Sequence, residues 1–175
     1  MLRQRVATSA QWFAGRAPSE TECNFLKTYF GDSLETKYLR IGASLGRRSW
    51  SPFGHRISLV RKHFRQRDVA SEIALEDPHS ASVFAHEAMH VWQRQGGRRV
   101  TWEAIPLQVA YTLGRFNPYV YEACDDPEQM LERFLRANVE QQAKMLEDFV
   151  YRERCGADVG EFEGVARHVR TRSVG

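Results

Sequence analysis

Two histidines spaced four residues apart, with an acid directly after the first, are the residues best suited to chemistry. They are His86, Glu87 and His90, and they form the pattern H-E-x-x-H inside the apolar segment Val83–Gln93. On a helix, side chains four residues apart share one face, so both imidazoles can reach a single ion. Catalytic zinc sites use three protein ligands and keep one position open to water. The pattern therefore predicts Zn²⁺ held by His86 and His90, with Glu87 as general base.

The alternative to a metal site is a core helix that carries the pattern by accident. Glutamate is almost never fully buried without a partner. Here Glu87 is surrounded in sequence by apolar residues, namely Val83, Phe84, Ala88, Val91 and Trp92. A nearby metal ion would explain such burial, so the sequence favours a zinc site.

A third ligand must come from another part of the chain. A metzincin would have a glycine three residues after His90 and a histidine three residues beyond it, but Gln93 and Gly96 stand there, which excludes that class. A glutamate on a later helix is the remaining common solution. The residues alone leave several candidates open: Glu140, Glu103, Glu122, Asp125, Asp148, His55 and His168.

Length and composition indicate one domain over residues 1–175, with a lead-in over 1–17 and a tail from about 156 to 175 that we expect to be loosely ordered. The formal net charge is +3, and the basic residues are scattered except in the tail. Without a recognised module, this pattern argues against nucleic-acid binding. We therefore rank that function last.

Three isolated cysteines, Cys23, Cys124 and Cys155, suggest neither a disulfide framework nor a cysteine zinc site. The first residues carry charge but no apolar stretch of signal-peptide length, and no later segment reads as a membrane span. We therefore expect synthesis in the cytoplasm without a signal peptide. A resident enzyme and export by a contact-dependent secretion system are both compatible with this.

Local signals place helices around the motif. A capping box at Ser19 and Glu22 predicts a helix that ends at Gly31. The motif helix should run from about Pro78 to Gln95. Further helices are expected at Thr101–Leu113 and, as one long region, from Asp125 to about Arg154, together with a short helix around Gln11, Trp12 and Phe13.

Two alternating segments, Thr36–Gly42 and His55–Val60, predict strands across a loop rich in glycine, serine and arginine. We expect them to form a small antiparallel sheet beside the motif helix. The fold class is then α+β and mostly helical. An exposed sheet edge can accept an extended peptide as a further strand, or it can simply complete the core, and the sequence leaves both open.

The chain resembles the compact gluzincin-type, zincin-like metallopeptidase domains of bacteria, in particular Vgr-related effector domains of type VI secretion. The resemblance covers roughly residues 20–150 and is carried by Phe30–Ser33, by H-E-x-x-H-V-W-Q at His86–Gln93 and by V-E-Q-Q-A at Val139–Ala143. It implies that Glu140 is the third zinc ligand. It also implies a peptide or protein substrate, and as partners a secretion spike protein or a cognate immunity protein.

One departure concerns the residue that orients a zinc histidine. Many gluzincins have an acid four residues after the ligand glutamate, but Lys144 stands there, which leaves Glu147 or Asp148 for this role. We treat Gln93 as a packing residue at the helix end. Tyr121 is our first choice for a donor to the oxyanion of the transition state, ahead of Tyr119, Tyr111 and His168.

The sequence thus predicts a zinc metallopeptidase, with an antibacterial secreted effector as its context. The competing hypothesis is a zincin-like binding or structural module without turnover. An intact Glu87 favours the enzyme, because a purely structural zinc site is closed by a fourth protein ligand and has no use for a base.

Overall fold

The computed structural model describes residues 15–51 and 53–172, so the helix expected around Gln11 lies outside the described residues. The elements are α2 (Glu20–Phe30), β1 (Arg40–Ala43), β2 (Arg56–Leu59), the 3-10 turns η1 (Arg61–His63) and η2 (Arg65–Arg67), α3 (Pro78–Gln95), α4 (Val100–Thr112), α5 (Pro127–Arg136), α6 (Val139–Arg154), η3 (Gly160–Phe162) and α7 (Glu163–Thr171). The expectation of a mostly helical α+β fold is confirmed.

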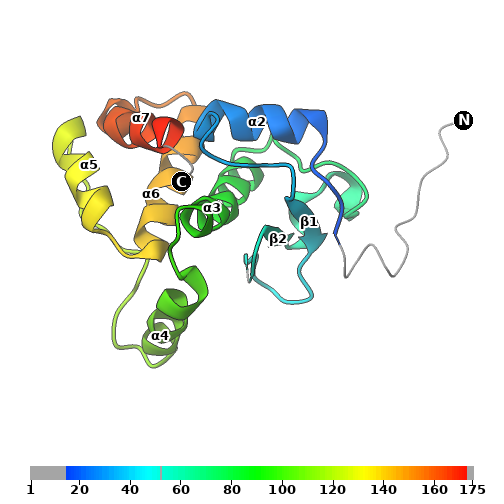
Figure 1. The fold of residues 1–175 in the computed structure, drawn as a ribbon, viewed down its shortest axis with the longest axis horizontal. Coiled ribbons are helices and arrows are strands. Elements are labelled where there is room, and N and C mark those ends of the chain that lie inside the picture. The colour runs from blue at the N-terminus through cyan, green and yellow to red at the C-terminus, as the bar shows by residue number, and fades with distance from the viewer. Residues whose placement is uncertain (1–14, 52, 173–175) are drawn as a thin grey trace, which may run out of the picture.

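Helix α3 runs through the middle of the fold and packs most extensively against α6 (Figure 1). Its alanines at 81, 85 and 88 are fully buried, as is Ala143 on α6. Small side chains at such an interface let two helices approach closely, because the distance between helix axes depends on the residues at the contact. The motif helix is therefore held at the centre of the core.

Side-chain caps set the starts of the two helices that local signals predicted most sharply. Ser19 and Glu22 form the expected capping box of α2. The carboxylate of Asp77 accepts a hydrogen bond from the Ser80 amide at the start of α3, and Pro78 occupies the first turn. The predicted bounds of α3 are confirmed.

The sheet is parallel, so the expectation of an antiparallel pair is wrong. β1 and β2 run in the same direction, with Arg40 paired to Arg56 and Ala43 to Leu59. The cause is the path of the loop between them. Trp50 forms an antiparallel bridge with Ser58, so the chain reverses once between β1 and Trp50 and a second time before β2, which leaves the two strands parallel. The sheet does lie beside α3 as expected, since β2 contacts that helix.

Both outer edges of the sheet carry a bridge. The Ile41 backbone exchanges hydrogen bonds of 2.8 Å with Arg16, and the Ser58 backbone exchanges bonds of 2.9 Å with Trp50. These partners occupy the positions at which an added peptide strand would pair. The arrangement therefore favours an edge that completes the core over one that binds a substrate strand.

The long helical region expected up to Arg154 is two helices. α5 ends at Arg136, and Asn138 has extended backbone angles and caps α6. The Asn138 side chain accepts hydrogen bonds of 2.9 Å from the Glu140 and Gln141 amides, and Gln141 accepts one in return. This break places Glu140 in the first turn of α6.

The segment beyond residue 156, which the sequence analysis treats as a tail, contains η3 and α7. Val165, Ala166 and Val169 of α7 are buried, and the helix packs against α5 and α2. Arg172 lies over the Trp92 ring, 3.3 Å from its centroid, and so covers the end of α3. None of the described helices combines the length and the apolar character that crossing a membrane requires.

A buried ion pair joins α2 to the preceding chain and to the loop before α3. Arg16 contacts both carboxylate oxygens of Glu22 at 2.6 Å and donates to the Val69 and Ser71 carbonyls. Glu22 is fully buried and also accepts a hydrogen bond from the Ile73 amide. Removal of one partner from such a pair leaves a buried charge uncompensated.

We predict that Glu22→Ala lowers the free energy of unfolding by about 3–5 kcal/mol, because it leaves the Arg16 guanidinium without its partner. Urea denaturation followed by circular dichroism measures the effect. The control is Glu20→Ala on the exposed face of the same helix, which should change stability by about 0.5 kcal/mol or less. Equal losses in the two variants would contradict the role of the pair.

Candidate metal centre

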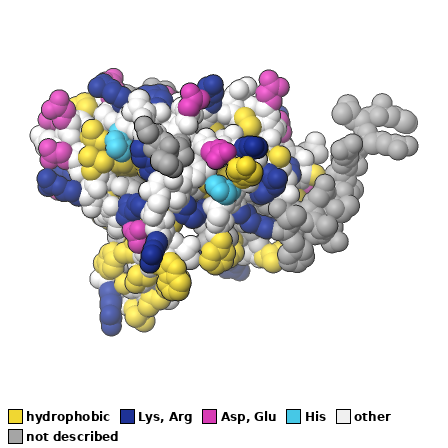
Figure 2. All heavy atoms as spheres, viewed as in Figure 1, with side chains coloured by type: hydrophobic (Ala, Val, Ile, Leu, Met, Phe, Trp, Pro, Cys, Tyr) yellow, Lys and Arg dark blue, Asp and Glu magenta, His cyan; other side chains and the backbone are white. Residues whose placement is uncertain are grey.

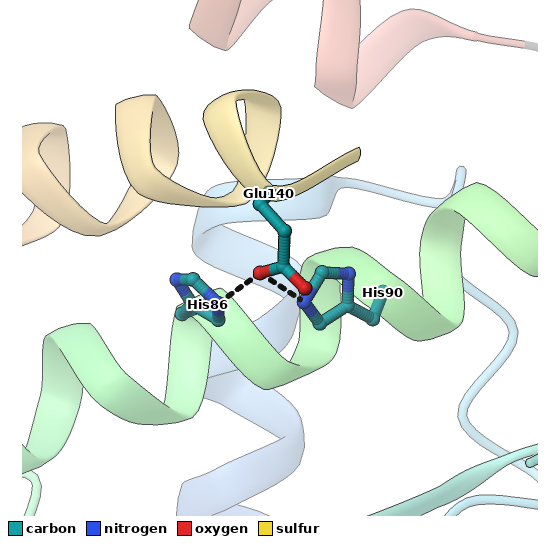
Figure 3. Close-up of side chains that lie close together, drawn as sticks. All are labelled: His86, His90 and Glu140. Atoms are coloured by element: carbon teal, nitrogen blue, oxygen red, sulfur yellow. Dashed lines mark ion pairs between the residues drawn. The ribbon is translucent and has the colours of Figure 1, made fainter. Parts of the chain in front are cut away.

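Three side chains from two helices converge in the core. His86 and His90 project from α3 one turn apart, and Glu140 points from α6 toward the space between them (Figure 3). The Nε2 atoms of His86 and His90 lie 3.6 and 3.5 Å from Glu140 Oε2. Their potential ligand atoms all lie within 4.8 Å of one another, and no other such group of three occurs among the residues that the structure describes.

This arrangement fits a divalent metal ion. Atoms bound at about 2.0–2.2 Å from one tetrahedral ion are themselves roughly 3–4 Å apart, which matches both contacts to Glu140. Two imidazoles and one carboxylate are a common donor set of catalytic zinc sites, with one position left open. His86, His90 and Glu140 can therefore hold a metal ion without rearrangement of the backbone.

The Nδ1 atom of His86 faces a carboxylate. Glu147, two turns along α6, places Oε2 2.8 Å from it. A carboxylate at this distance favours a proton on Nδ1, and a proton there leaves Nε2 free to bind a metal. Of the two acids left open by the sequence, Asp148 instead contacts the Lys144 ammonium at 2.6 Å and accepts a hydrogen bond from Tyr121.

His90 is oriented by a residue that the sequence analysis assigned to packing. Its Nδ1 atom lies 3.0 Å from Gln93 Oε1, and the Gln93 amide donates to the Val139 carbonyl and to Gln142 Oε1 on α6. Gln93 is fully buried. Its position three residues after His90, on the same helix face, was the sequence signal that could have predicted this contact.

Burial and charge set the protonation of the metal-free centre. Burial on its own lowers the pKa of His86, but the facing carboxylates of Glu140 and Glu147 raise it to about 10. Burial on its own raises the pKa of Glu140, but the two histidines hold it well below its usual range. Likewise, His86 and Lys144 outweigh burial and lower the pKa of Glu147 to about 2. In the absence of metal, a proton on His86 thus balances these carboxylates.

Glu87 is buried without a partner for one of its oxygens. The residue is 4% exposed, and Oε2 makes no hydrogen bond within the described part of the chain. Burial raises the pKa of Glu87, an effect that His86 and His90 oppose. Buried polar atoms are nearly always paired. An unpaired carboxylate oxygen beside a metal-binding group is the property expected of a general base.

Tyr119, rather than Tyr121, is the tyrosine next to the centre. Its ring centroid lies 6.2 Å from that of His86, and its hydroxyl accepts a hydrogen bond of 2.6 Å from Gln108. The Tyr121 hydroxyl donates to Asp148 at 2.9 Å. Tyr111 packs edge-on against Tyr119 with ring centroids 6.0 Å apart.

The other candidate ligands make their contacts with residues outside the metal centre. Glu103 pairs with Arg98, Glu122 lies 3.7 Å from Arg133, and His55 Nδ1 lies 3.1 Å from the Gln95 amide. His168 packs against the rings of Trp92 and Phe134. None of them, nor Asp125, belongs to the described group of three ligands.

The centre lines two adjoining cavities. The larger, about 1460 Å³, is bounded by residues 43–51, by α4 and by Tyr119. The smaller, about 370 Å³, extends past His63 and His79. Both are lined by His86, Glu87 and Tyr119. Both cavities therefore border the centre.

The comparisons with known proteins give one structural relative. No family model matches the sequence, and no curated protein matches it significantly. Among solved structures, the chain is similar to the effector domain of Pseudomonas aeruginosa VgrG2b, with a TM-score of 0.65 and 26% sequence identity over 95% of this chain and 87% of that one. The resemblance to Vgr-related effector domains that the sequence indicated is confirmed.

We predict that Glu147→Gln weakens zinc binding about 10- to 100-fold, because His86 loses the carboxylate that orients it. Asp148→Asn is the matched control on the same helix and should leave the affinity within about twofold, since Asp148 pairs with Lys144 and Tyr121 rather than with a histidine of the centre. Competition with a chromogenic chelator measures both affinities. A larger loss in the Asp148 variant would reverse this assignment.

We also predict that zinc affinity rises with pH. The raised pKa keeps His86 protonated at neutral pH in the metal-free protein, so a binding ion must displace that proton. The affinity should increase about tenfold per pH unit between about pH 7 and pH 9, and calorimetry in buffers of different ionisation enthalpy should detect the released proton. An affinity that is constant over this range would contradict the protonated state.

Proposed function

We propose that this chain is a zinc-dependent peptide-bond hydrolase. The observation that carries the proposal is the convergence of His86, His90 and Glu140 beside a buried glutamate with an unpaired oxygen. A zinc ion held there supplies Lewis acidity, which polarises a carbonyl group and lowers the pKa of water. Nitrogen ligands and a single carboxylate make zinc the fitting metal, since sites for Mg²⁺ or Ca²⁺ are built from oxygen ligands.

Glu87 is the residue that moves the proton. Its Oε2 atom takes a proton from the attacking water and then delivers it to the leaving amine, so that the carboxylate is restored at the end of the cycle. Burial raises the pKa of Glu87, which makes the carboxylate a stronger base than a solvated glutamate. The base therefore gains strength from the apolar core around it.

Tyr119 is proposed to stabilise the oxyanion of the transition state. Gln108 donates to the Tyr119 oxygen, which leaves the phenolic proton available for a substrate. Tyr121 was our choice from sequence, but its proton is already donated to Asp148. A donor that borders both cavities can reach a carbonyl bound at the centre.

The biological context proposed is that of a secreted effector. The match to the VgrG2b effector domain extends over nearly the whole chain, which supports a role as a spike-associated effector with a cognate immunity protein as partner. The target would then be a protein or cell-wall peptide of another bacterium. This context rests on the structural match, whereas the hydrolase activity rests on the site.

A binding module without turnover is the second candidate. Such a module would need the ion only for stability, and structural zinc sites are closed by four protein ligands. Here the centre has three candidate ligands and opens onto a cavity of about 1460 Å³. The open site and the unpaired Glu87 oxygen favour the enzyme.

We predict about one zinc per chain in purified protein, reduced by His86→Ala or Glu140→Ala. Glu87→Gln should keep the metal and lower peptide hydrolysis by about 10²- to 10⁴-fold, since it removes only the base. Metal analysis and cleavage of a broad peptide library measure both properties. Glu132→Gln, on the exposed side of α5, is the control and should change neither.

Two outcomes would contradict these roles. Loss of zinc from Glu87→Gln equal to that from Glu140→Ala would make Glu87 a ligand rather than a base. Cleavage by wild type and Glu87→Gln alike would contradict the role of Glu87 as the base, and cleavage by neither would favour the binding module.

A further inference from the structure

The charges around the cleft are strongly asymmetric. Among the lysine, arginine, aspartate and glutamate residues that line the two described cavities, the acids all belong to the metal centre, and every other one is a lysine or an arginine. They are Arg47, Arg48, Arg56, Arg61 and Lys62, and the acids are Glu87, Glu140 and Glu147. A cleft walled by one sign of charge attracts ligands of the opposite sign. The surroundings of the centre therefore favour an anionic ligand.

Two of these arginines sit on a loop that the protein holds in place. Ser44 Oγ donates to the Arg48 carbonyl at 2.7 Å, and Ser49 Oγ accepts from the Val60 amide at 3.1 Å. Trp50 adds the bridge to β2. Arg47 and Arg48 are exposed, and both line each cavity. They consequently stand where the two cavities meet beside the centre.

Helix α4 supplies a mostly apolar wall of the larger cavity. Helix α4 lines the larger cavity with Val100, Ala104, Ile105 and Val109, and Ile105 and Val109 are 51% and 55% exposed. Hydrophobic side chains gather on the surface where α4 lies (Figure 2). Exposed apolar groups that border a cavity commonly mark a ligand-binding surface. A nucleic-acid backbone would gain little from such a wall, whereas the side chains of a peptide can use both walls.

We propose that the substrate is an acidic peptide segment, whose carboxylate side chains lie against Arg47 and Arg48 and whose apolar side chain lies against Ile105 and Val109. This proposal rests on the proposed hydrolase function of the same centre. It locates specificity on two elements, the loop 44–51 and α4, that do not supply the metal ligands.

The test uses peptides that share one apolar sequence and carry glutamate, glutamine or lysine at the same two positions. Binding of the fluorescein-labelled peptides to zinc-loaded Glu87→Gln protein is measured by anisotropy, and cleavage is measured with the wild type. We expect the glutamate peptide to bind on the order of tenfold more tightly than the glutamine peptide, and the lysine peptide to bind least. The preference should weaken at high salt.

Charge reversal at the loop should invert the preference. The double variant R47E/R48E is made in the Glu87→Gln background, and in it the lysine peptide should bind better than the glutamate peptide. R167E on the exposed face of α7 makes a like change of charge away from both cavities and should leave the order unchanged. Ile105→Asn should weaken binding of all three peptides alike. If R47E/R48E does not fold, R47Q and R48Q should each reduce the preference.

The outcomes separate this proposal from the hydrolase function. Cleavage of all three peptides at equal rates, with no effect of charge at positions 47 and 48, would overturn the substrate class and leave the hydrolase intact. Arginine-dependent binding of the glutamate peptide without cleavage would support the substrate class and count against the hydrolase. Tighter arginine-dependent binding of a single-stranded oligonucleotide, with displacement of the peptide, would overturn the proposal in favour of a nucleic acid.

Discussion

The contact between α3 and α6 is the constraint on which the rest of the structure depends. It brings the Glu140 carboxylate to 3.5–3.6 Å from two imidazoles of the motif helix. Two features fix the register of this contact. The Asn138 cap defines the first turn of α6, and Gln93 reaches from α3 to the Val139 carbonyl and Gln142. A shift of one residue in either helix would turn the carboxylate away from the histidines, because successive residues of a helix point in different directions.

This contact buries several polar and charged side chains inside an apolar core. Glu87, His90, Gln93, Glu140 and Gln142 are all buried. Buried polar groups destabilise a fold unless each is hydrogen-bonded or paired. Gln93 links His90 to Gln142 within this cluster, and Gln142 also donates to the Phe134 carbonyl and accepts from Arg98 outside it. The exceptions in this cluster are a Glu87 oxygen and the lone pairs that face the ligand group, which are the atoms that a metal ion and its substrate would use.

Sequence signals correctly predicted the features that depend on residues close together in the chain. The cap at Ser19 and the bounds of α3 follow from local hydrogen bonds, and the pairing of His86 with His90 follows from helix geometry. The convergence of Glu140 on them was implied only by resemblance, because it depends on how two distant helices pack. The strand direction was missed since the bridge of Trp50 to Ser58 is a tertiary contact, and the break at Asn138 was missed because the helical pattern continues across it. The choice of Glu147 over Asp148 likewise required the position of α6 on α3.

The same structure divides chemistry from recognition. The centre is built from buried and half-buried residues of α3 and α6, the two helices that pack most extensively against each other. Helix α4 is different, because Val100 is its only buried residue among those described and it extends away from the main body (Figure 1). The exposed apolar residues of α4 and the loop 44–51 can therefore change without altering the packing that positions His86, His90 and Glu140. A fold organised in this way can retain one metal-binding centre while the walls of the adjoining cavity vary in sequence.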